Sequence, residues 1–191
     1  MRMLSSSTRL DLRKAKVLLV DDNPQSLELM SQVLVGFRVG RIATCRSAEE
    51  ARETVAAVAY DLIIIDGEMP EEDGISLARH IRSQREAPNF TAPIVVVSGH
   101  TPVEKVTTAR DAGANFVVKK PIAPGVLLSR IEWLARNSRQ FVTTQSYCGP
   151  DRRFKNQPLP GDVAERRSDA IALTANPERA MSQDEVDSLF G

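Results

Sequence analysis

The sequence is poor in the residue types on which several classes of protein depend. Its 191 residues include two cysteines, Cys45 and Cys148, which lie far apart and show no CxxC spacing, so we expect neither a disulfide framework nor a zinc site. No apolar run approaches the ~20 residues that a membrane helix needs, and residues 1–16 contain no apolar segment of signal-peptide length. These absences favour a cytoplasmic protein with free thiols that does not bind membranes.

An excess of charge of either sign is also absent. The chain has 25 basic and 25 acidic residues, and a formal net charge of zero argues against a polycation that binds nucleic acid. The balance changes only near the end, where residues 138–167 carry six basic and three acidic groups, and residues 168–191 carry one basic and five acidic groups. We therefore expect protein partners rather than nucleic acid.

Short apolar runs alternate with helical patterns between residues 16 and 137. The apolar runs, rich in β-branched residues, are 17–20, 62–65, 94–97 and 116–118, with a weaker run at 41–45. Apolar residues at helical spacing occupy 24–37, 47–58, 74–86, 102–111 and 124–136. Five strands alternating with five helices predict an α/β fold, a doubly wound five-stranded parallel sheet with helices on both faces.

Polar residues follow four of the five apolar runs, namely Asp21-Asp22, Asp66, Ser98 and Lys119-Lys120. In such folds the carboxyl ends of the strands meet at the edge where ligands bind. Carboxylates that converge there repel one another unless a cation lies between them, and hard oxygen ligands suit Mg²⁺. A carboxylate nucleophile, a magnesium ion, a lysine and a hydroxyl together are typical of phosphoryl transfer.

Each of these residues alone has an ordinary structural explanation. Asp21 or Asp22 could cap the helix that follows them, Asp66 could be a turn residue, and Lys120 could be a solvated lysine. Their joint occurrence, in order along one framework, favours the phosphoryl-transfer site.

The motifs as a set resemble the receiver domain of two-component response regulators. They are Asp21-Asp22, Asp66-Gly67-Glu68-Met69-Pro70, Asp73-Gly74, Ser98-Gly99, Gly113-Ala114 and Lys120-Pro121. The resemblance covers residues 16–137, and it extends to the separations, 44 residues from Asp22 to Asp66 and 22 from Ser98 to Lys120. It implies a flavodoxin-like fold and a phosphoprotein whose partner is a histidine kinase or a histidine phosphotransfer protein.

The resemblance also implies a role for each residue. Asp66 would accept the phosphoryl group, and Ser98 and Lys120 would contact its oxygens. The implied Mg²⁺ ligands are Asp21, Asp22, Asp66 and the backbone carbonyl of Glu68. Phosphorylation would draw Ser98 toward the new group and shift the face around residues 102–111. The chain would then be a phosphoryl acceptor with slow autodephosphorylation rather than an enzyme.

One position departs from the family pattern. Receivers usually carry an aromatic residue three positions before the Lys of Lys-Pro, and this residue turns inward on activation. Here that position is Val117. Phe116 is adjacent, but neighbouring strand residues face opposite sides of a sheet. Either Phe116 takes the role through a local shift, or the chain has no aromatic switch.

The rest of the chain is expected to be largely disordered. We predict a flexible N-terminus at 1–14, a receiver domain at 15–137, a disordered basic, Pro-containing linker at 138–180 and a short amphipathic peptide at 181–191.

The terminal peptide has the features of a short helix. Ser182 and Glu185 form a capping-box pattern, Met181 and Val186 a hydrophobic staple, and the apolar face consists of Val186, Leu189 and Phe190. This segment resembles the receiver-binding N-terminal peptide of flagellar switch proteins, which points to chemotaxis or motility. It could dock on its own receiver, dock on another receiver or a motor component, or have no partner.

We therefore predict a response regulator that is phosphorylated on Asp66 and acts through protein contacts. One alternative is a receiver-like adaptor that no longer needs phosphate, which Val117 keeps open. Another is a Mg²⁺-dependent phosphohydrolase with an Asp nucleophile. Such enzymes place the nucleophile on the first strand with a second Asp two residues later, whereas Asp21 and Asp22 are adjacent.

Overall fold

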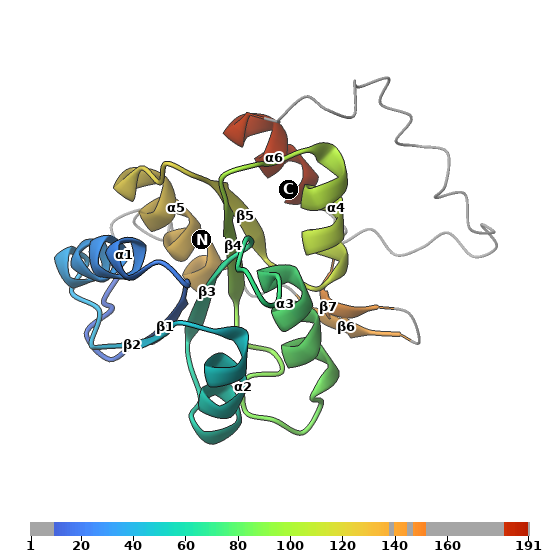
Figure 1. The fold of residues 1–191 in the computed structure, drawn as a ribbon, viewed down its shortest axis with the longest axis horizontal. Helices are drawn as coiled ribbons and strands as arrows, with labels where there is room; N and C mark the ends of the chain where they lie inside the picture. The colour runs from blue at the N-terminus through green and yellow to red at the C-terminus, as the bar shows by residue number, and fades with distance from the viewer. Residues whose placement is uncertain (1–9, 138–139, 145–146, 152–181, 191) are drawn as a thin grey trace, which may run out of the picture.

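The central sheet is parallel and five-stranded. The computed structural model describes residues 10–137, 140–144, 147–151 and 182–190 (Figure 1). The strands are β1 (Lys16–Val20), β2 (Arg41–Cys45), β3 (Leu62–Asp66), β4 (Ile94–Ser98) and β5 (Phe116–Lys119). They lie in the order β2-β1-β3-β4-β5, and every neighbouring pair is parallel. The predicted fold class is confirmed.

Helices cover both faces of this sheet. They are α1 (Pro24–Gly36), α2 (Ala48–Ala57), α3 (Gly74–Ser83), α4 (Val103–Asp111) and α5 (Pro124–Arg136). Helices α1 and α5 lie on one face, and α2, α3 and α4 lie on the other (Figure 1). Four helices end within a residue or two of the predicted bounds, but α3 ends at Ser83 rather than at residue 86. The chain turns there because Gln84 leaves the helical conformation.

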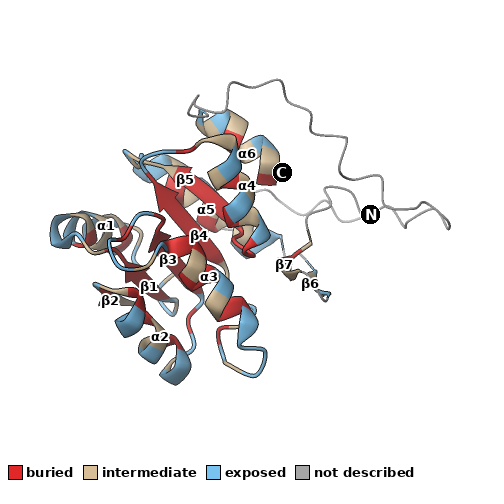
Figure 2. Cartoon of the chain, turned by 45° about the vertical axis from the view of Figure 1, so that its right-hand side comes forward, coloured by how far each residue is buried: buried red, intermediate tan, exposed pale blue. Residues whose placement is uncertain are grey.

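The core explains why the strands have no polar face. Every residue of β3 and β4 is buried, as are the last four of β1 (Figure 2). Strands covered by helices on both sides need apolar side chains at consecutive positions rather than at alternate ones. The edge strand β2 is less buried, which matches its weaker apolar run.

A small hairpin follows α5, so the described residues 140–144 and 147–151 depart from the disordered linker predicted at 138–180. Strands β6 (Phe141–Thr143) and β7 (Cys148–Pro150) pair antiparallel. The ring of Phe141 lies 4.9 Å from that of Phe90, and Arg82 lies over the Phe141 ring. A Cβ on Gly113, whose φ is +89°, would lie 2.6 Å from the Cys148 carbonyl oxygen, so glycine allows the hairpin to approach closely. Strands of three residues are too short to show a periodic pattern.

The described part of the N-terminus is also held in place, contrary to the predicted flexible segment at 1–14. Leu10 and Leu12 pack against the core, and the Leu12 carbonyl accepts hydrogen bonds from Ala15 and Gly40. Residues 1–9 lie outside the described residues.

At the other end of the chain, α6 (Gln183–Phe190) lies beside α4 and β5 (Figure 1). The predicted capping box is formed, since Glu185 N–H donates to Ser182 Oγ and Ser182 N–H donates to the Glu185 carboxylate. Met181, the other half of the predicted staple, lies outside the described residues, as does most of the predicted linker. Among the described residues, none of the helices is long and apolar enough to cross a membrane.

Candidate functional site

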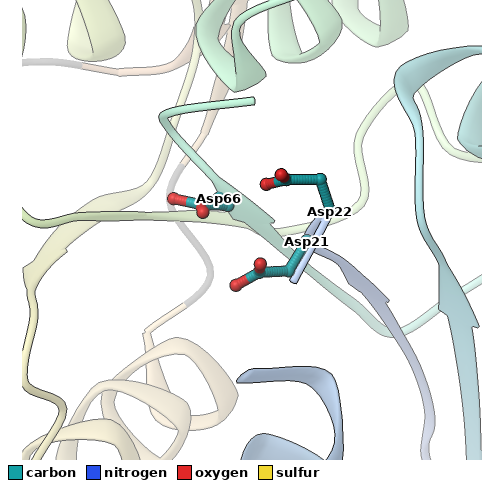
Figure 3. A group of neighbouring side chains, drawn as sticks. All are labelled: Asp21, Asp22 and Asp66. Atoms are coloured by element: carbon teal, nitrogen blue, oxygen red, sulfur yellow. The ribbon is translucent and has the colours of Figure 1, made fainter. Parts of the chain in front are cut away.

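Three carboxylates meet at the carboxyl ends of β1 and β3. Asp21 and Asp22 directly follow β1, and Asp66 is the last residue of β3. Because Val20 pairs with Ile65 in the parallel register, the two strands end level with each other. Oxygen atoms of the three side chains lie within 4.8 Å of one another (Figure 3). The structure thus brings together the three acidic residues that the strand-end argument singled out.

Asp21 is held by the first turn of α1. Its carboxylate accepts hydrogen bonds from Asn23 N–H at 2.9 Å and from the Ser26 hydroxyl at 2.5 Å. The N-cap of α1 is Asn23, whose side chain accepts from the N–H groups of Gln25 and Ser26. The alternative in which Asp21 or Asp22 caps this helix is therefore wrong, and both carboxylates remain available to the site.

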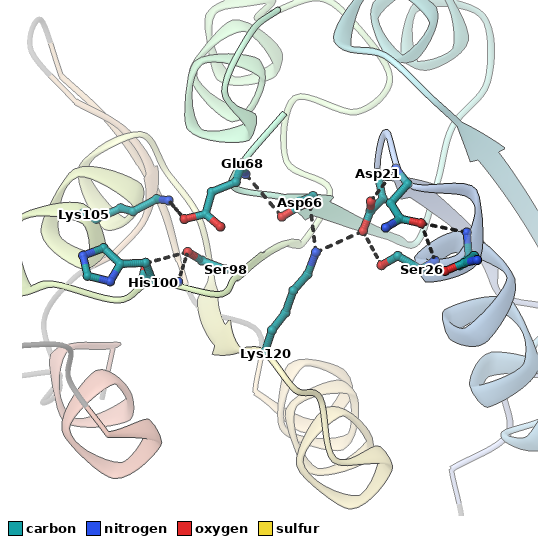
Figure 4. A network of polar contacts seen from close by, with 10 residues as sticks. Asp21, Ser26, Asp66, Glu68, Ser98, His100, Lys105 and Lys120 are labelled. Atoms are coloured by element: carbon teal, nitrogen blue, oxygen red, sulfur yellow. Dashed lines mark hydrogen bonds and ion pairs between the residues drawn. The ribbon is translucent and has the colours of Figure 1, made fainter. Parts of the chain in front are cut away.

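Lys120 connects the two buried acids of this cluster. Its ammonium Nζ lies 2.8 Å from Asp66 Oδ2 and 3.2 Å from Asp21 Oδ2 (Figure 4). The peptide bond between Lys120 and Pro121 is cis. These contacts bring the Lys120 side chain to both carboxylates.

The charges in this cluster balance incompletely. Burial raises the pKa of Asp66, the hydrogen bond and charge of Lys120 lower it in part, and the Asp21 carboxylate raises it again. Burial alone would lower the pKa of Lys120, but the hydrogen bond and charge of Asp66 raise it above its ordinary value. Lys120 therefore stays protonated, and the ionised form of Asp66 is less stable than that of a solvated carboxylate.

Ser98 is buried at the end of β4, but its hydroxyl points into its own loop. Ser98 Oγ donates to the His100 carbonyl at 2.6 Å and accepts from the His100 N–H at 3.3 Å (Figure 4). Among the described contacts, the Ser98 hydroxyl is not bonded to the side chain of Asp66 or Lys120, and Ser98 meets Lys120 through the backbone, where its carbonyl accepts from the Lys120 N–H at 2.8 Å. Of the predicted site residues, Ser98 is the one that this structure leaves apart from the carboxylates.

A second ion pair flanks the cluster. Lys105 of α4 donates to the Glu68 carboxylate at 2.6 Å, and this contact lowers the pKa of Glu68. An open groove of about 630 Å³ lies here, and its lining includes Asp22, Glu68, Met69 and Lys105. A large donor group therefore has access to the acidic cluster from the side of α3 and α4.

A glycine brings α3 close to the site. A Cβ on Gly74 would lie 1.9 Å from the Asp66 carbonyl oxygen and 2.6 Å from Ile65 Cγ2. Asp73 before it caps α3 by accepting from the Ser76 N–H at 2.7 Å. The Asp73-Gly74 motif thus has a physical role, because only glycine lets the helix begin against the end of β3.

Two contributors to the site, Ser26 and Lys105, were missed in the sequence. Both lie on helices at positions where a polar residue is the usual surface choice. Ser26 bonds to Asp21, five residues before it, and Lys105 bonds to Glu68, 37 residues before it. No sequence motif links pairs at these separations.

Comparison with known proteins places this geometry in a family. Residues 17–132 match the family model of the response regulator receiver domain. The chain belongs to this family. The chain is 31% identical over 128 residues to protein PetR of Rhodobacter capsulatus, and 37% identical over 147 residues to a protein-glutamate methylesterase/protein-glutamine glutaminase of Syntrophus aciditrophicus. These alignments cover 66% and 75% of this chain but 51% and 40% of the relatives, so the chain spans about half or less of their length.

Solved structures support the same assignment. The chemotaxis protein CheY4 of Vibrio cholerae superposes with a TM-score of 0.58 at 28% identity, covering 62% of this chain and 97% of CheY4. The receiver domain of DrrB, solved in its BeF3-activated state, superposes with a TM-score of 0.57 at 25% identity, covering 65% of this chain and 99% of DrrB.

In this receiver domain Phe116 does not replace the aromatic residue expected at Val117. Val117 faces α4, where it lies with Thr101, Lys105 and Val106. Phe116 points to the opposite side, with its ring edge-on to Trp133 of α5 at 5.2 Å. Strand alternation separates the two side chains, so on the α4 side the position of the usual aromatic switch holds a valine.

The donor set of the receiver domain fits a magnesium ion. Three carboxylates supply hard oxygen atoms within 4.8 Å of one another, and one ammonium group, that of Lys120, reaches two of them. The three negative charges exceed the neighbouring positive charge of Lys120, and a small divalent cation would neutralise this excess. Carboxylate oxygens are also the ligand type that such a cation prefers.

Proposed function

We propose that this receiver domain accepts a phosphoryl group on Asp66 in a Mg²⁺-dependent reaction and transmits the signal by protein contact. The observation that carries the proposal is the Lys120 ammonium between Asp66 and Asp21. It supports the role because a fixed cation beside a buried carboxylate can hold a phosphoryl oxygen once that carboxylate is phosphorylated. Asp21, Asp22, Asp66 and the Glu68 backbone carbonyl would hold Mg²⁺, which would supply positive charge for the phosphoryl oxygens.

The donor is a phosphohistidine of a histidine kinase or a histidine phosphotransfer protein. A carboxylate oxygen of Asp66 attacks phosphorus, the bond from phosphorus to the imidazole nitrogen breaks, and the imidazole leaves with the bonding electron pair and takes up a proton. Lys120 and the hydroxyl of Ser98 then contact the new phosphoryl oxygens. Ser98 must first release the His100 carbonyl, so this contact moves the loop between β4 and α4.

Three other features of the chain support a cellular setting for this reaction. Both cysteines are free, which fits a reducing cytoplasm. The zero net charge favours proteins over nucleic acid as output partners. The terminal peptide and the likeness to a chemotaxis protein point to motility as the regulated process. The chain is an acceptor that loses its phosphoryl group slowly, not a turnover enzyme.

Labelling of the full chain tests the proposal. We expect incubation with Mg²⁺ and a small acyl phosphate to label the wild-type protein on an acid-stable, base-labile carboxyl phosphate. Asp66→Asn should abolish the label, and chelation of Mg²⁺ should prevent it. Asp61→Asn is the matched control, since Asp61 is an exposed carboxylate that binds the Lys16 N–H away from the cluster. Wild-type labelling of Asp66→Asn would refute the assignment.

Two other functions make different predictions in the same experiment. A phosphate-independent adaptor, which Val117 favours, would bind its partner equally well with and without the label. A phosphohydrolase would release inorganic phosphate in many turnovers. Stoichiometric labelling with slow loss separates the proposed acceptor from the phosphohydrolase, and tighter partner binding by the labelled protein separates it from the adaptor.

A further inference from the structure

Helix α6 covers the free edge of the central sheet. Strand β5 is the outermost strand on that side, so its outer backbone groups have no neighbouring strand. The side-chain amide of Gln183 pairs with them: its Nε2 donates to the Val117 carbonyl at 3.1 Å, and its Oε1 accepts from the Lys119 N–H at 2.7 Å. One glutamine thus satisfies a donor and an acceptor of the edge strand, as the backbone of an added strand would.

The rest of α6 complements the same surface. Val186 and Phe190 are buried, and the Phe190 ring lies 6.2 Å from that of Phe116. Asp187 forms an ion pair with Arg130 of α5 and accepts from Gln183 Nε2 at 2.9 Å. We call the surface formed by Phe116, Val117, Lys119 and Arg130 the β5 face. Apolar, hydrogen-bonding and charged contacts all match on this face, so the helix is seated specifically.

The β5 face adjoins the phosphoacceptor site through one peptide unit. Lys119 N–H binds Gln183, and the next residue, Lys120, binds Asp66 and Asp21 through its side chain. The Lys120 N–H also donates to the Ser98 carbonyl at 2.8 Å. A phosphoryl group on Asp66 places new oxygens beyond the present carboxylate, so Lys120 and Ser98 must shift to contact them. Such shifts move the end of β5, to which Gln183 is bound at two points.

We propose that α6 is a tethered ligand that covers the β5 face while Asp66 carries no phosphoryl group, and that phosphorylation releases it. A helix that makes the same contacts would be weakened equally, so the freed face is open to a protein that does not depend on the two hydrogen bonds to the β5 edge. The covering itself is independent of the proposed function, whereas the release rests on it.

Peptide competition on the full chain tests the covering. A fluorescent synthetic peptide of residues 182–191 is titrated with the wild type, with Val186→Asp, which places a charge in the buried contact, and with Ser188→Asp. Ser188 is exposed on the same helix, so the control adds the same charge outside the contact. A face that is covered in nine of ten chains binds an external peptide about tenfold more weakly. We expect Val186→Asp to bind the peptide at least about tenfold more tightly than the other two proteins. Equal affinities of all three would overturn the covering.

Beryllofluoride, a phosphoryl mimic, tests the release. With Mg²⁺ present, we expect it to weaken binding of the peptide to Val186→Asp, whose β5 face is uncovered, by about 5- to 150-fold, the usual range of coupling between two sites. By reciprocity, saturating peptide should weaken beryllofluoride binding to Val186→Asp by the same factor, and Val186→Asp without peptide should bind beryllofluoride more tightly than the wild type. The emission of Trp133, the single tryptophan, should change in parallel because its ring contacts Phe116 beneath Phe190.

Fluorine NMR separates the two ways in which the release can fail. A signal of bound fluoride that is absent from Asp66→Asn shows that the site is occupied. If that signal appears and the peptide affinity stays unchanged, the release is overturned while the phosphoacceptor role stands. If no bound fluoride appears at all, the proposed function fails, and the release fails with it.

Discussion

Replacing Arg82 by methionine should destabilise the domain by removing the donor that joins four segments. Arg82 is 2% exposed and has no carboxylate partner among the described contacts. Its guanidinium donates to the carbonyls of Phe90 at 2.7 Å, Ala92 at 2.8 Å and Gly113 at 3.1 Å, and it lies 5.3 Å from the centroid of the Phe141 ring. Burial lowers the pKa of Arg82 to about 10, so the group remains charged at neutral pH.

The size of the effect follows from these bonds. Arg82→Met keeps a long apolar stem but leaves three carbonyls without the Arg82 donor, two of them on the buried residues Ala92 and Gly113, at about 1–3 kcal/mol for each buried carbonyl. Removing a desolvated charge offsets part of this loss. We therefore expect the free energy of unfolding to fall by about 2–4 kcal/mol. The β6–β7 hairpin, which loses the cation beneath Phe141, should lose protection against amide exchange at the same time.

Urea unfolding followed by circular dichroism measures the first effect, and hydrogen exchange measures the second. Arg79→Met is the matched control, because Arg79 is exposed on the same helix and its replacement should change the free energy of unfolding by no more than about 0.5 kcal/mol. A loss below about 1 kcal/mol for Arg82→Met, with the hairpin still protected, would refute the reasoning, since water would then satisfy the carbonyls equally well.

Two further predictions concern the site. Gly74→Ala should lower the free energy of unfolding by at least about 2 kcal/mol and weaken beryllofluoride binding. Gly125→Ala, which has open space around its Cβ, should change the free energy of unfolding by less than about 1 kcal/mol. Equal stability of the two variants in urea would contradict this prediction. Lys120→Met should raise the pKa of Asp66 further, because Lys120 now lowers it. The acidic limb of the phosphorylation rate then moves to higher pH, since the nucleophile must be ionised. Carboxyl ¹³C NMR measures the pKa of Asp66. The control Lys105→Met should raise the pKa of Glu68 instead. An unchanged pKa of Asp66 in Lys120→Met would count against the contact between Lys120 and Asp66.

The sheet and most of the site could be predicted because they follow from local rules. Buried strands need continuous apolar runs, and chain order then fixes which strand ends meet. Asp21, Asp22, Asp66 and Lys120 were singled out on that basis, and they converge. The rule predicts a position at the sheet edge but not a rotamer, which is why Ser98 was expected near the carboxylates and is found bound to the His100 carbonyl.

The features that could not be predicted depend on partners distant in sequence. Arg82 looks like an ordinary polar residue near the end of a helix, and its burial results from a loop and a turn that close over it 8 to 31 residues later. The hairpin after α5 is held by the contacts of Phe141 with Phe90 and Arg82. The position of α6 depends likewise on Gln183, a residue that no capping or periodicity rule distinguishes.

The position of Val117 decides how a signal can travel from Asp66 to the β5 face. With a valine facing α4 and Phe116 facing α5, neither side chain can act as an aromatic switch between the two. The strand backbone remains, and it is bound on both sides of one peptide unit, by Gln183 at Lys119 and by the Ser98 carbonyl at Lys120. A pair of hydrogen bonds to a strand edge requires the correct register and distance, so a small shift of β5 weakens both bonds together. Coupling through the backbone therefore explains how this receiver domain can release α6 without the aromatic residue.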